Sequence, residues 1–418
     1  MKQSNFITKF AEAKDPLSIE EYKKLGGFKA LEKAAGMSSE GIINEIKESG
    51  LKGRGGAGVS TGFKWSTLVE DEETYIVCNA DEGEPGTFKD RYLMKNCPYL
   101  LIEGMAIAGI TAKSKTGYIY IRGEYPIIAA QLEKAIKRAE DAGYLGNDIL
   151  GTGKNFSLNI RKGGGSYVVG DETALLNSLM GNRGYPMFKP PYPTQSGLWE
   201  KPTIINNVET LSCIPLIIKE GAKWFAKIGS KDDPGPKLYC LSGHVKNPGV
   251  YEFPMGVKLS EIIDSAGGIE GNFKAVQIGG TAGPVYDKRA MEFNLDYSSM
   301  KKNGGALGSG AIVVMNTTVN MVHVLEVITR FFSEESCGQC FACRYGTRQL
   351  EFMAKRMASG EAKMEYLTYM DEILKTMDGS SFCPFGQSVK LPLSSLFKYF
   401  GDEIKSFLKQ QRYMKEVV

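Results

Sequence analysis

Histidine is almost absent from this chain: His244 and His323 are the only two in 418 residues. Neither lies near the glycine-rich or cysteine-rich segments described below. Hydrolases that use imidazole as a general base, and metal centres that depend on histidine ligands, are therefore disfavoured. The chemistry of this protein must come from other side chains or from a bound cofactor.

Strong charge and long apolar runs are also missing. A formal net charge of +3 gives no reason to expect nucleic acid or an anionic membrane as a partner. The apolar run from Tyr99 to Ala112 contains Glu103 and is too short to cross a bilayer, and the N-terminus lacks the apolar core of a secretory signal. We expect a cytoplasmic protein without direct membrane insertion, which could reach the cytoplasmic face of the inner membrane through a complex.

The cysteines are few but unevenly placed. Three of the eight form the run Cys337-Gly-Gln-Cys340-Phe-Ala-Cys343, and a fourth precedes a proline at Cys383. This spacing is typical of [4Fe–4S] ligands, whereas a structural zinc site usually has two separated Cys-x-x-Cys pairs. Three free thiols with a coincidental fourth are the remaining alternative. An iron–sulfur cluster transfers single electrons, which indicates a redox protein. The other cysteines are scattered, and we expect them to be buried free thiols: Cys78, Cys97, Cys213 and Cys240.

The order of periodic segments predicts several domains. Helical patterns fill residues 1–50, and strands alternate with helices over 51–232, as in a parallel α/β domain. Residues 233–320 contain short strands with one helix. From residue 321 to 418 the pattern is helical, which favours a bundle of about four helices that holds the cluster.

Two glycine-rich loops are candidates for anion binding. The first, Gly53-Arg54-Gly55-Gly56-Ala57-Gly58, matches a dinucleotide fingerprint by letter, but it follows a helical pattern instead of a strand. Its glycines would let backbone N–H groups approach a phosphate, with positive charge from Arg54 or Lys64; the alternative is a mobile loop without a ligand. The second loop, at 163–165, leaves a predicted strand and precedes a predicted helix, the geometry that directs amide dipoles at a phosphate.

Polar residues follow the second loop and two predicted strands. Asp171 and Glu172 could be binding residues or ordinary first-turn carboxylates. The segment from Asn79 to Glu84 follows a buried strand, where parallel sheets bind ligands, and Asn206-Asn207 follows another. Four polar turns together with a cluster motif indicate a bound redox cofactor.

Taken together, five motifs in one order resemble a known family. They are Lys52–Gly58, Cys78–Arg91, Lys189–Pro193, Lys201–Thr210 and Cys337–Arg344. The chain resembles, from about residue 20 to 405, the FMN- and NADH-binding subunit of respiratory complex I (NADH:quinone oxidoreductase) and its soluble NADH dehydrogenase and hydrogenase diaphorase relatives. This resemblance implies an α/β, Rossmann-like FMN domain, a ubiquitin-like α+β domain of the SLBB type, and a C-terminal four-helix bundle that carries one [4Fe–4S] cluster.

The resemblance also implies roles for individual residues. Glu84 would lie near the nicotinamide as the catalytic residue, Lys189 and Tyr192 would lie along the dinucleotide, and Cys337, Cys340, Cys343 and Cys383 would bind the cluster. The FMN pocket would comprise Gly53, Arg54, Gly55, Gly56, Gly58, Lys64, Asn79, Asp81, Glu82, Gly83, Tyr167, Gly170, Asp171, Glu172, Ile205, Asn206, Asn207 and Thr210.

The implied reaction passes hydride from NADH to FMN, followed by single electrons through the cluster. In the family these electrons reach a thioredoxin-like [2Fe–2S] subunit and a larger iron–sulfur subunit, which we expect as partners.

Four positions depart from the family pattern. Val59 and Thr67 replace two aromatic residues that resemble stacking partners of adenine, while Gly83 replaces a serine and Asp171 a glutamate. A stacked aromatic contact contributes about 0.5–1.5 kcal/mol beyond burial, so the loss of two would weaken NADH binding by roughly one to two orders of magnitude. The alternative function is an electron relay that uses NADPH, a non-nicotinamide donor or a partner protein.

Overall fold

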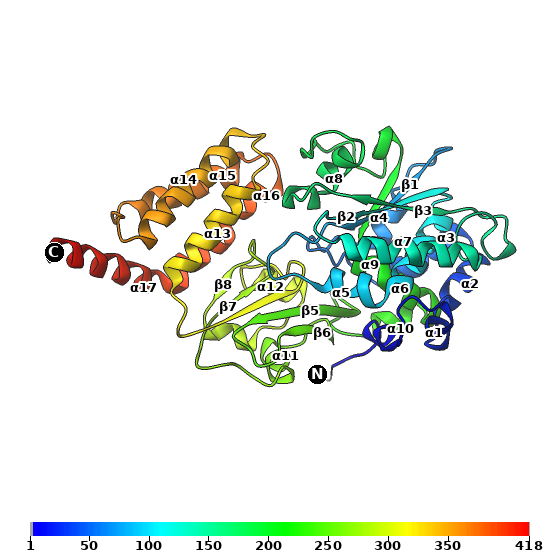
Figure 1. The fold of residues 1–418 in the computed structure, drawn as a ribbon, viewed down its shortest axis with the longest axis horizontal. Coiled ribbons are helices and arrows are strands. Elements are labelled where there is room, and N and C mark those ends of the chain that lie inside the picture. The colour runs from blue at the N-terminus through cyan, green and yellow to red at the C-terminus, as the bar shows by residue number, and fades with distance from the viewer. Residues whose placement is uncertain (1–2, 418) are drawn as a thin grey trace.

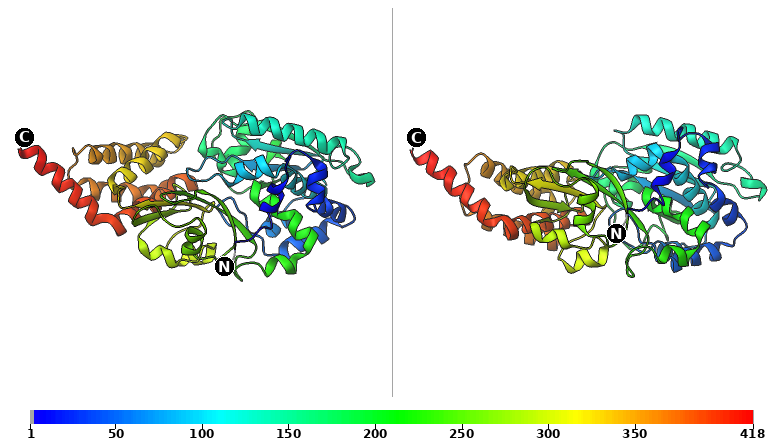
Figure 2. Two further views of the ribbon diagram at one scale, coloured as in Figure 1. Left: turned by 60° about the horizontal axis from the view of Figure 1, so that its bottom comes forward. Right: turned by 90° about the horizontal axis from the view of Figure 1, so that it is seen from below.

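The computed structural model describes residues 3–417, which form three parts (Figure 1). The first part contains the parallel sheet, the second a smaller mixed sheet and the third the helices. In Figures 1 and 2 the first and third parts lie at opposite ends of the molecule.

The first part is a layered α/β structure. Its strands are β1 (Tyr75–Ala80), β2 (Thr116–Ile121), β3 (Ser157–Lys162) and β4 (Thr203–Asn207). Its helices are η1 (Thr8–Glu12), α1 (Ile19–Lys24), α2 (Lys29–Ala35), α3 (Ser39–Glu48), α4 (Thr61–Ser66), α5 (Lys89–Asn96), α6 (Pro98–Thr111), α7 (Pro126–Asp141), η2 (Ile149–Gly151), η3 (Tyr167–Gly170), α8 (Glu172–Leu179), η4 (Leu198–Glu200), α9 (Val208–Glu220) and α10 (Ala222–Ala226).

The four strands are parallel in the order β3-β2-β1-β4. The chain runs outward from β1 through β2 to β3 and then returns to the other side of β1, where Asn79 pairs with Asn207. The direction of winding therefore reverses between β1 and β4. In parallel sheets such a switch point opens a crevice at the carboxyl ends of the strands, where ligands bind.

Helix α6 explains the apolar run of the sequence, because all of its residues are buried. Glu103 lies within it, and its carboxylate accepts hydrogen bonds from the backbone N–H groups of Phe28 and Leu31, both at 3.0 Å. Burial raises the pKa of Glu103, and these bonds offset the cost of the buried carboxyl group. No helix in the described part of the chain is long and apolar enough to cross a membrane.

The second part is a mixed sheet in the order β6-β5-β9-β7-β8 around its own apolar core. Strands β5 and β9 are parallel, whereas the β5–β6 and β7–β9 pairs are antiparallel. Its elements are β5 (Pro236–Gly243), β6 (Gly249–Pro254), α11 (Leu259–Ser265), β7 (Phe273–Ile278), β8 (Val285–Tyr286), η5 (Lys288–Glu292), α12 (Tyr297–Lys302) and β9 (Ala311–Asn316).

The third part is a helical bundle with a separate core rich in leucine, methionine and phenylalanine. Its elements are α13 (Met321–Glu335), α14 (Phe341–Ala358), α15 (Tyr366–Ser380), the short α16 (Pro384–Ser388) and α17 (Lys390–Val417). The predicted fold class is confirmed: a parallel α/β layer, a small α+β sheet and a bundle of four long helices.

Candidate functional site

Residues from four separate segments meet where β1 and β4 end. The amide of Asn79 donates to the Gly170 carbonyl at 2.9 Å, which joins the end of β1 to η3. Beside it, Glu172 of α8 accepts from Lys64 of α4 at 2.9 Å and from Lys189 at 2.6 Å. Lys64 also donates to the Ile205 carbonyl of β4, at 3.2 Å.

Asp171 and Glu172 differ in what they contact. Asp171 is the N-cap of α8 and accepts from the Thr173 N–H at 2.9 Å, as a helix-capping residue does. Burial alone would raise the pKa of Glu172, but Lys64 and Lys189 together hold it below its ordinary value. Glu172 is therefore an ionised carboxylate between two ammonium groups, beyond the role of a first-turn residue.

The first glycine loop follows helix α3, as expected, and is wedged between β4–α9 and the second part. The Arg54 N–H donates to the Thr210 hydroxyl at 2.8 Å, and the Tyr297 hydroxyl donates to the Gly53 carbonyl at 2.8 Å. A Cβ at Gly55 would lie 3.1 Å from the Asn207 Cβ. Glycine is therefore required by the close approach of the loop to the end of β4.

The side chain of Arg54 does not serve as a surface charge for an anion. It is fully buried, and its Nη2 donates to the Pro234 carbonyl at 2.7 Å, toward the second part. Its Nε and Nη1 have no hydrogen-bond partner among the described residues. The positive charge expected at this loop is therefore supplied by Lys64, while Arg54 contributes its backbone.

The acidic loop after β1 contains carboxyl groups with different surroundings. Burial raises the pKa of Asp81 to about 7, against a weaker lowering by Arg122, and Asp81 Oδ2 is buried without a partner in the described chain. The carboxylate of Glu82 accepts from the N–H groups of Asp90 and Arg91, at 2.7 and 2.9 Å, where α5 begins. Glu82 thus fixes α5, and Asp81 is left free for a ligand.

Glu84 connects the acidic loop to both neighbouring segments. It accepts from the Tyr167 hydroxyl and, at 3.0 Å, from the Ala282 N–H of the second part. Burial raises the pKa of Glu84, and these hydrogen bonds oppose that shift. A Cβ at Gly83 would lie 3.2 Å from the Tyr167 ring, so glycine there permits the loop to pass close to Tyr167.

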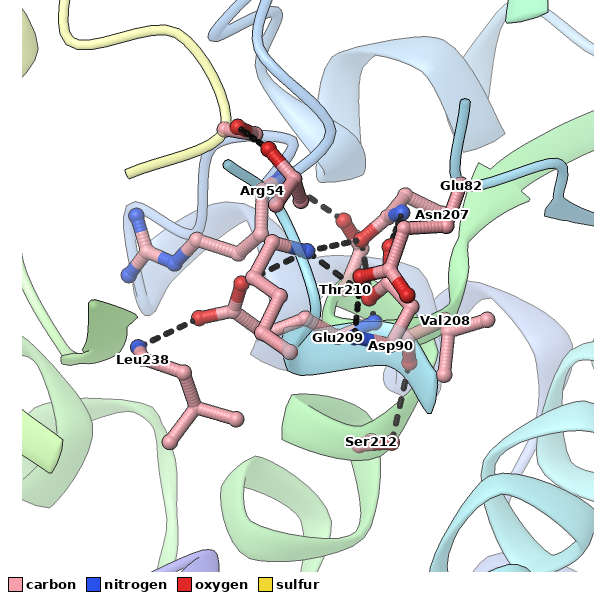
Figure 3. A network of polar contacts seen from close by, with 12 residues as sticks. Arg54, Glu82, Asp90, Asn207, Val208, Glu209, Thr210, Ser212 and Leu238 are labelled. Atoms are coloured by element: carbon pink, nitrogen blue, oxygen red, sulfur yellow. Dashed lines mark hydrogen bonds and ion pairs between the residues drawn. The ribbon is translucent and has the colours of Figure 1, made fainter. Parts of the chain in front are cut away.

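A buried network of charges supports the crevice from below (Figure 3). Glu209 accepts from Lys237 at 2.6 Å and lies 3.0 Å from Lys89, which contacts Asp90 at 2.7 Å. The Asn207 amide donates to Asp90 at 2.7 Å. Burial lowers the pKa of Lys237 to about 8 although Glu209 opposes the shift, and burial would raise the pKa of Glu209 if Lys237 and Lys89 did not hold it down. This network was not predicted from the sequence, although Lys89, Asp90 and Glu209 lie within its motifs.

The four predicted cluster ligands lie together at one end of the bundle. Cys337 lies between α13 and α14, Cys340 precedes α14, Cys343 is in its first turn, and Cys383 is the N-cap of α16. Burial raises the pKa of Cys343 to about 12, and the other three sulfurs are near enough to raise it further. No three histidine, cysteine or acidic side chains among residues 3–417 are grouped to hold a single metal ion. This arrangement suits a cubane, in which each thiolate binds a different iron.

The other thiols are confirmed as buried and free: Cys78, Cys97, Cys213 and Cys240. Burial raises the pKa of each, so they are unreactive as nucleophiles.

The crevice and the cysteines are neighbours across η3. The Tyr167 N–H donates to Glu335 of α13 at 2.8 Å, and the Tyr167 ring lies 5.8 Å from that of Phe385, two residues after Cys383. Cys337 packs against the apolar cluster that contains Val168 and Val169. One short 3-10 helix therefore contacts both predicted cofactor sites.

The positions that depart from the family pattern are at the outer edge of this site. Val59 is 48% exposed, and the Thr67 hydroxyl lies 3.1 Å from that of Thr194. Tyr192 is also exposed at 54%. Of the three, only Tyr192 offers an aromatic ring.

Comparison with known proteins places the chain among redox subunits. Family models match over residues 46–216 (Nuo51 FMN-binding domain), 238–285 (SLBB domain) and 323–407 (NADH-ubiquinone oxidoreductase-F iron-sulfur binding region). The second F-type subunit of the NADH-quinone oxidoreductase of Rhizobium meliloti (strain 1021) is 43% identical, over 94% of this chain and 95% of that protein. The F-type subunit of the Escherichia coli (strain K12) NADH-quinone oxidoreductase is 41% identical, over 95% and 91%.

Hydrogenase subunits are similar as well. The NADP-reducing hydrogenase subunit HndC of Solidesulfovibrio fructosivorans is 39% identical, over 98% of this chain and 85% of that protein. A crystal structure of NAD+-reducing [NiFe]-hydrogenase in the H2-reduced state contains a chain that superposes with a TM-score of 0.87 at 32% identity, over 97% of this chain and 67% of that chain. The chain belongs to the family of F-type subunits of NADH-quinone oxidoreductase.

Proposed function

We propose that this protein is the flavoprotein subunit of an NADH-oxidising electron-transfer complex, with FMN in the β1–β4 crevice and a [4Fe–4S] cluster on the four cysteines. The observation that carries the proposal is the position of Tyr167. Its segment borders the crevice through Gly170 and Glu84 and contacts the bundle through Glu335 and Phe385. Two redox centres held on either side of one helical turn are suited to exchange electrons.

The residues of the crevice fit a flavin mononucleotide. Lys64 and the N–H groups of the glycine loops suit the phosphate, and the unpartnered Asp81 oxygen and the amides of Asn206 and Asn207 suit hydroxyl groups of the ribityl chain. A side chain at Gly164 or Gly170 would meet no atom within 4 Å, which leaves space beside η3. When bound, FMN exchanges electron pairs with a nicotinamide and single electrons with the cluster.

We assign the outer edge of the site to the dinucleotide. Glu84 would orient the nicotinamide, while Lys189 and Tyr192 would hold the remainder of the molecule. The Glu172–Lys189 contact of 2.6 Å keeps the Lys189 ammonium group near the crevice. The protein's part in the reaction is to fix distance and orientation, which agrees with the absence of histidine from this site.

We further propose that the chain works within a larger assembly. Its partners would be a thioredoxin-like [2Fe–2S] subunit and a larger iron–sulfur subunit, and through them it would lie at the cytoplasmic face of the inner membrane. Proposed domain limits are 51–232, 233–320 and 321–418, after an N-terminal helical segment.

The proposal is tested by purifying the protein without oxygen and measuring flavin, iron and sulfide for each chain. Addition of NADH should bleach the flavin absorbance. A protein that contains zinc without iron, or a flavin that NADH leaves oxidised, would contradict the proposal.

A second donor is favoured by one observation, the missing aromatic rings at Val59 and Thr67. If NADPH or a reduced partner protein bleaches the flavin while NADH does not, the chain is an electron relay that shares the cofactors but not the nicotinamide specificity.

A further inference from the structure

A cavity of about 290 Å³ lies beside the cysteine site, on the side away from the crevice residues named above. It is bordered by the loop after α8 on one wall and by the α13–α14 connection on the other. Arg183, Arg344 and Arg348 line it, together with Ser333, Ser336 and the proposed cluster ligand Cys337.

The three arginines have no acidic partner. No carboxylate lines the cavity, and none of the three side chains forms an ion pair within residues 3–417. Arg344 donates to the Gly338 carbonyl at 2.8 Å, and Arg183 lies over the Tyr185 ring at 4.8 Å. Three guanidinium groups around one space repel one another, so an anion with oxygen acceptors is the complementary occupant.

An exposed aromatic stripe continues from this cavity along α14. Phe341, Tyr345 and Phe352 are 70%, 50% and 51% exposed. With Arg348 they are spaced by four, three and four residues, which places them on one face of the helix. The Phe341 and Tyr345 rings lie 4.6 Å apart, and Arg344 lies over Tyr345 at 5.3 Å, so the stripe and the cavity form one continuous surface.

We propose that this surface, the three arginines of the cavity with the aromatic stripe of α14, docks an acidic iron–sulfur electron-transfer protein whose carboxylates enter the cavity. Aromatic and arginine side chains are the residues enriched at protein interfaces. A small anion would need the arginines but would leave the exposed rings without a purpose. The stripe begins one residue after Cys340, so a partner on it lies next to the proposed electron exit.

The electron transfer at this surface is balanced without further reactants. One electron leaves the cluster site of this chain, one oxidised iron centre of the partner is reduced, and no bond forms or breaks. This inference rests on the proposed function, because the partner must accept electrons from the cluster.

Site-specific cross-linking locates the partner. The tagged complex is isolated from the source cells with a photoreactive phenylalanine analogue in place of Phe341 or Phe352, and with the same analogue at Ile127 of α7, which is 78% exposed, as the control. We expect products from α14, but not from position 127, that join an acidic segment of an iron–sulfur protein. Products that contain only a second copy of this chain, or no iron–sulfur protein, would overturn the proposal.

Charge reversal then tests the arginines with the partner so identified. Arg183→Glu combined with Arg348→Glu should weaken its binding at least about tenfold at low ionic strength, and less at high salt. The matched control, Lys134→Glu with Lys227→Glu, makes the same charge change on exposed residues of the first part and should have little effect. Equal loss in both variants, or none in the first, would contradict the assignment.

Two further measurements separate the outcomes. NADH-dependent reduction of ferricyanide should be unchanged in the arginine variant, because it bypasses the partner; if the wild-type protein contains no flavin or iron, the proposed function fails whatever the cross-links show. Titration with inorganic phosphate is the other. Phosphate binding that the arginine variant abolishes, together with unchanged partner binding, would make the cavity a small-anion site and overturn the docking proposal.

Discussion

The sheet crevice and the cysteine site of the bundle differ in how far the protein itself satisfies its functional groups. In the crevice nearly every charged side chain has a partner: Glu172 lies between two lysines, Glu84 accepts two hydrogen bonds, and Glu209 lies between Lys237 and Lys89. In the bundle four thiols converge beside three arginines without counter-ions.

This difference indicates two ways of preparing a cofactor site. The crevice is preorganised by contacts that exist without a ligand, so its geometry should persist in the apoprotein. The cysteine site has groups that only a metal cluster and an acidic partner complete, and there metal binding is expected to be coupled to folding of the surrounding helices. Single substitutions on either side can test that contrast.

The largest effect should come from removing a cluster ligand. Cys343→Ala should lower the iron content from about four atoms per chain toward zero, with loss of electron transfer to the partner, because no other thiol is near enough to replace it. FMN content should remain, since the crevice does not depend on the cluster. Iron, sulfide and flavin analysis measures both.

Cys97→Ala is the matched control, because Cys97 is a buried thiol of the first part that we do not assign to the cluster. Iron content should be unchanged in it. If Cys343→Ala lost flavin together with iron, the two sites would not be independent and the contrast would fail.

The next effect concerns the buried network. Glu209→Ala leaves Lys237 and Lys89 buried without their shared carboxylate, which typically costs about 3–5 kcal/mol. Urea unfolding of the apoprotein followed by tryptophan fluorescence measures it, because Trp65, Trp199 and Trp224 all lie in the first part.

Glu292→Ala provides the comparison. Glu292 pairs with Lys258 at the same 2.6 Å distance, but both side chains are exposed, and such pairs contribute about 0–1 kcal/mol. Equal losses in the two variants would show that the network does not stabilise the crevice.

These effects also show how much of the site was accessible from sequence. Strand β1 and its acidic loop, the N-cap Ser18 of α1, and the strand–loop–helix after β3 follow from local patterns, and the structure has them where those patterns predict. The cysteine spacing indicated the cluster because ligands three residues apart form a local signal.

Contacts between distant segments could not be predicted in this way. The Glu209–Lys237 pair depends on how the second part packs against α9, and the burial of Arg54 has the same cause. The reversal of strand order between β1 and β4 is a property of topology. Arg183 and Arg348 line one cavity although 165 positions separate them, and no motif spans such a distance.

A pH effect should distinguish the free carboxyl group of the crevice. Burial raises the pKa of Asp81 from 3.8 to about 7, so the folded apoprotein holds this proton more tightly than the unfolded chain. Its contribution to stability is complete below about pH 4 and is lost as the pH rises through 7, at most about 1.4 kcal/mol per pH unit. Asp81→Asn should remove that part of the slope in urea unfolding between pH 5 and 8.

Asp71 provides a control of opposite sign. Hydrogen bonds from the Glu73 N–H and from Lys201 lower its pKa, so its small contribution is lost as the pH falls. Asp71→Asn should leave the slope between pH 5 and 8 unchanged. If Asp81→Asn also leaves it unchanged, Asp81 is ionised in the apoprotein and does not await a ligand.

The smallest effect should be a gain at the outer edge of the crevice. Val59 is 48% exposed and directly follows the first glycine loop, so Val59→Phe can add a ring without disturbing the core. A stacked aromatic contributes about 0.5–1.5 kcal/mol, which corresponds to roughly two- to tenfold tighter dinucleotide binding. Val327→Phe on α13, where the valine is 52% exposed, adds the same ring far from the crevice and should change nothing. Because the crevice is preorganised, the gain should appear in the KM for NADH with little change in kcat; a change in kcat alone would mean that the ring disturbs the flavin site and does not contact the dinucleotide.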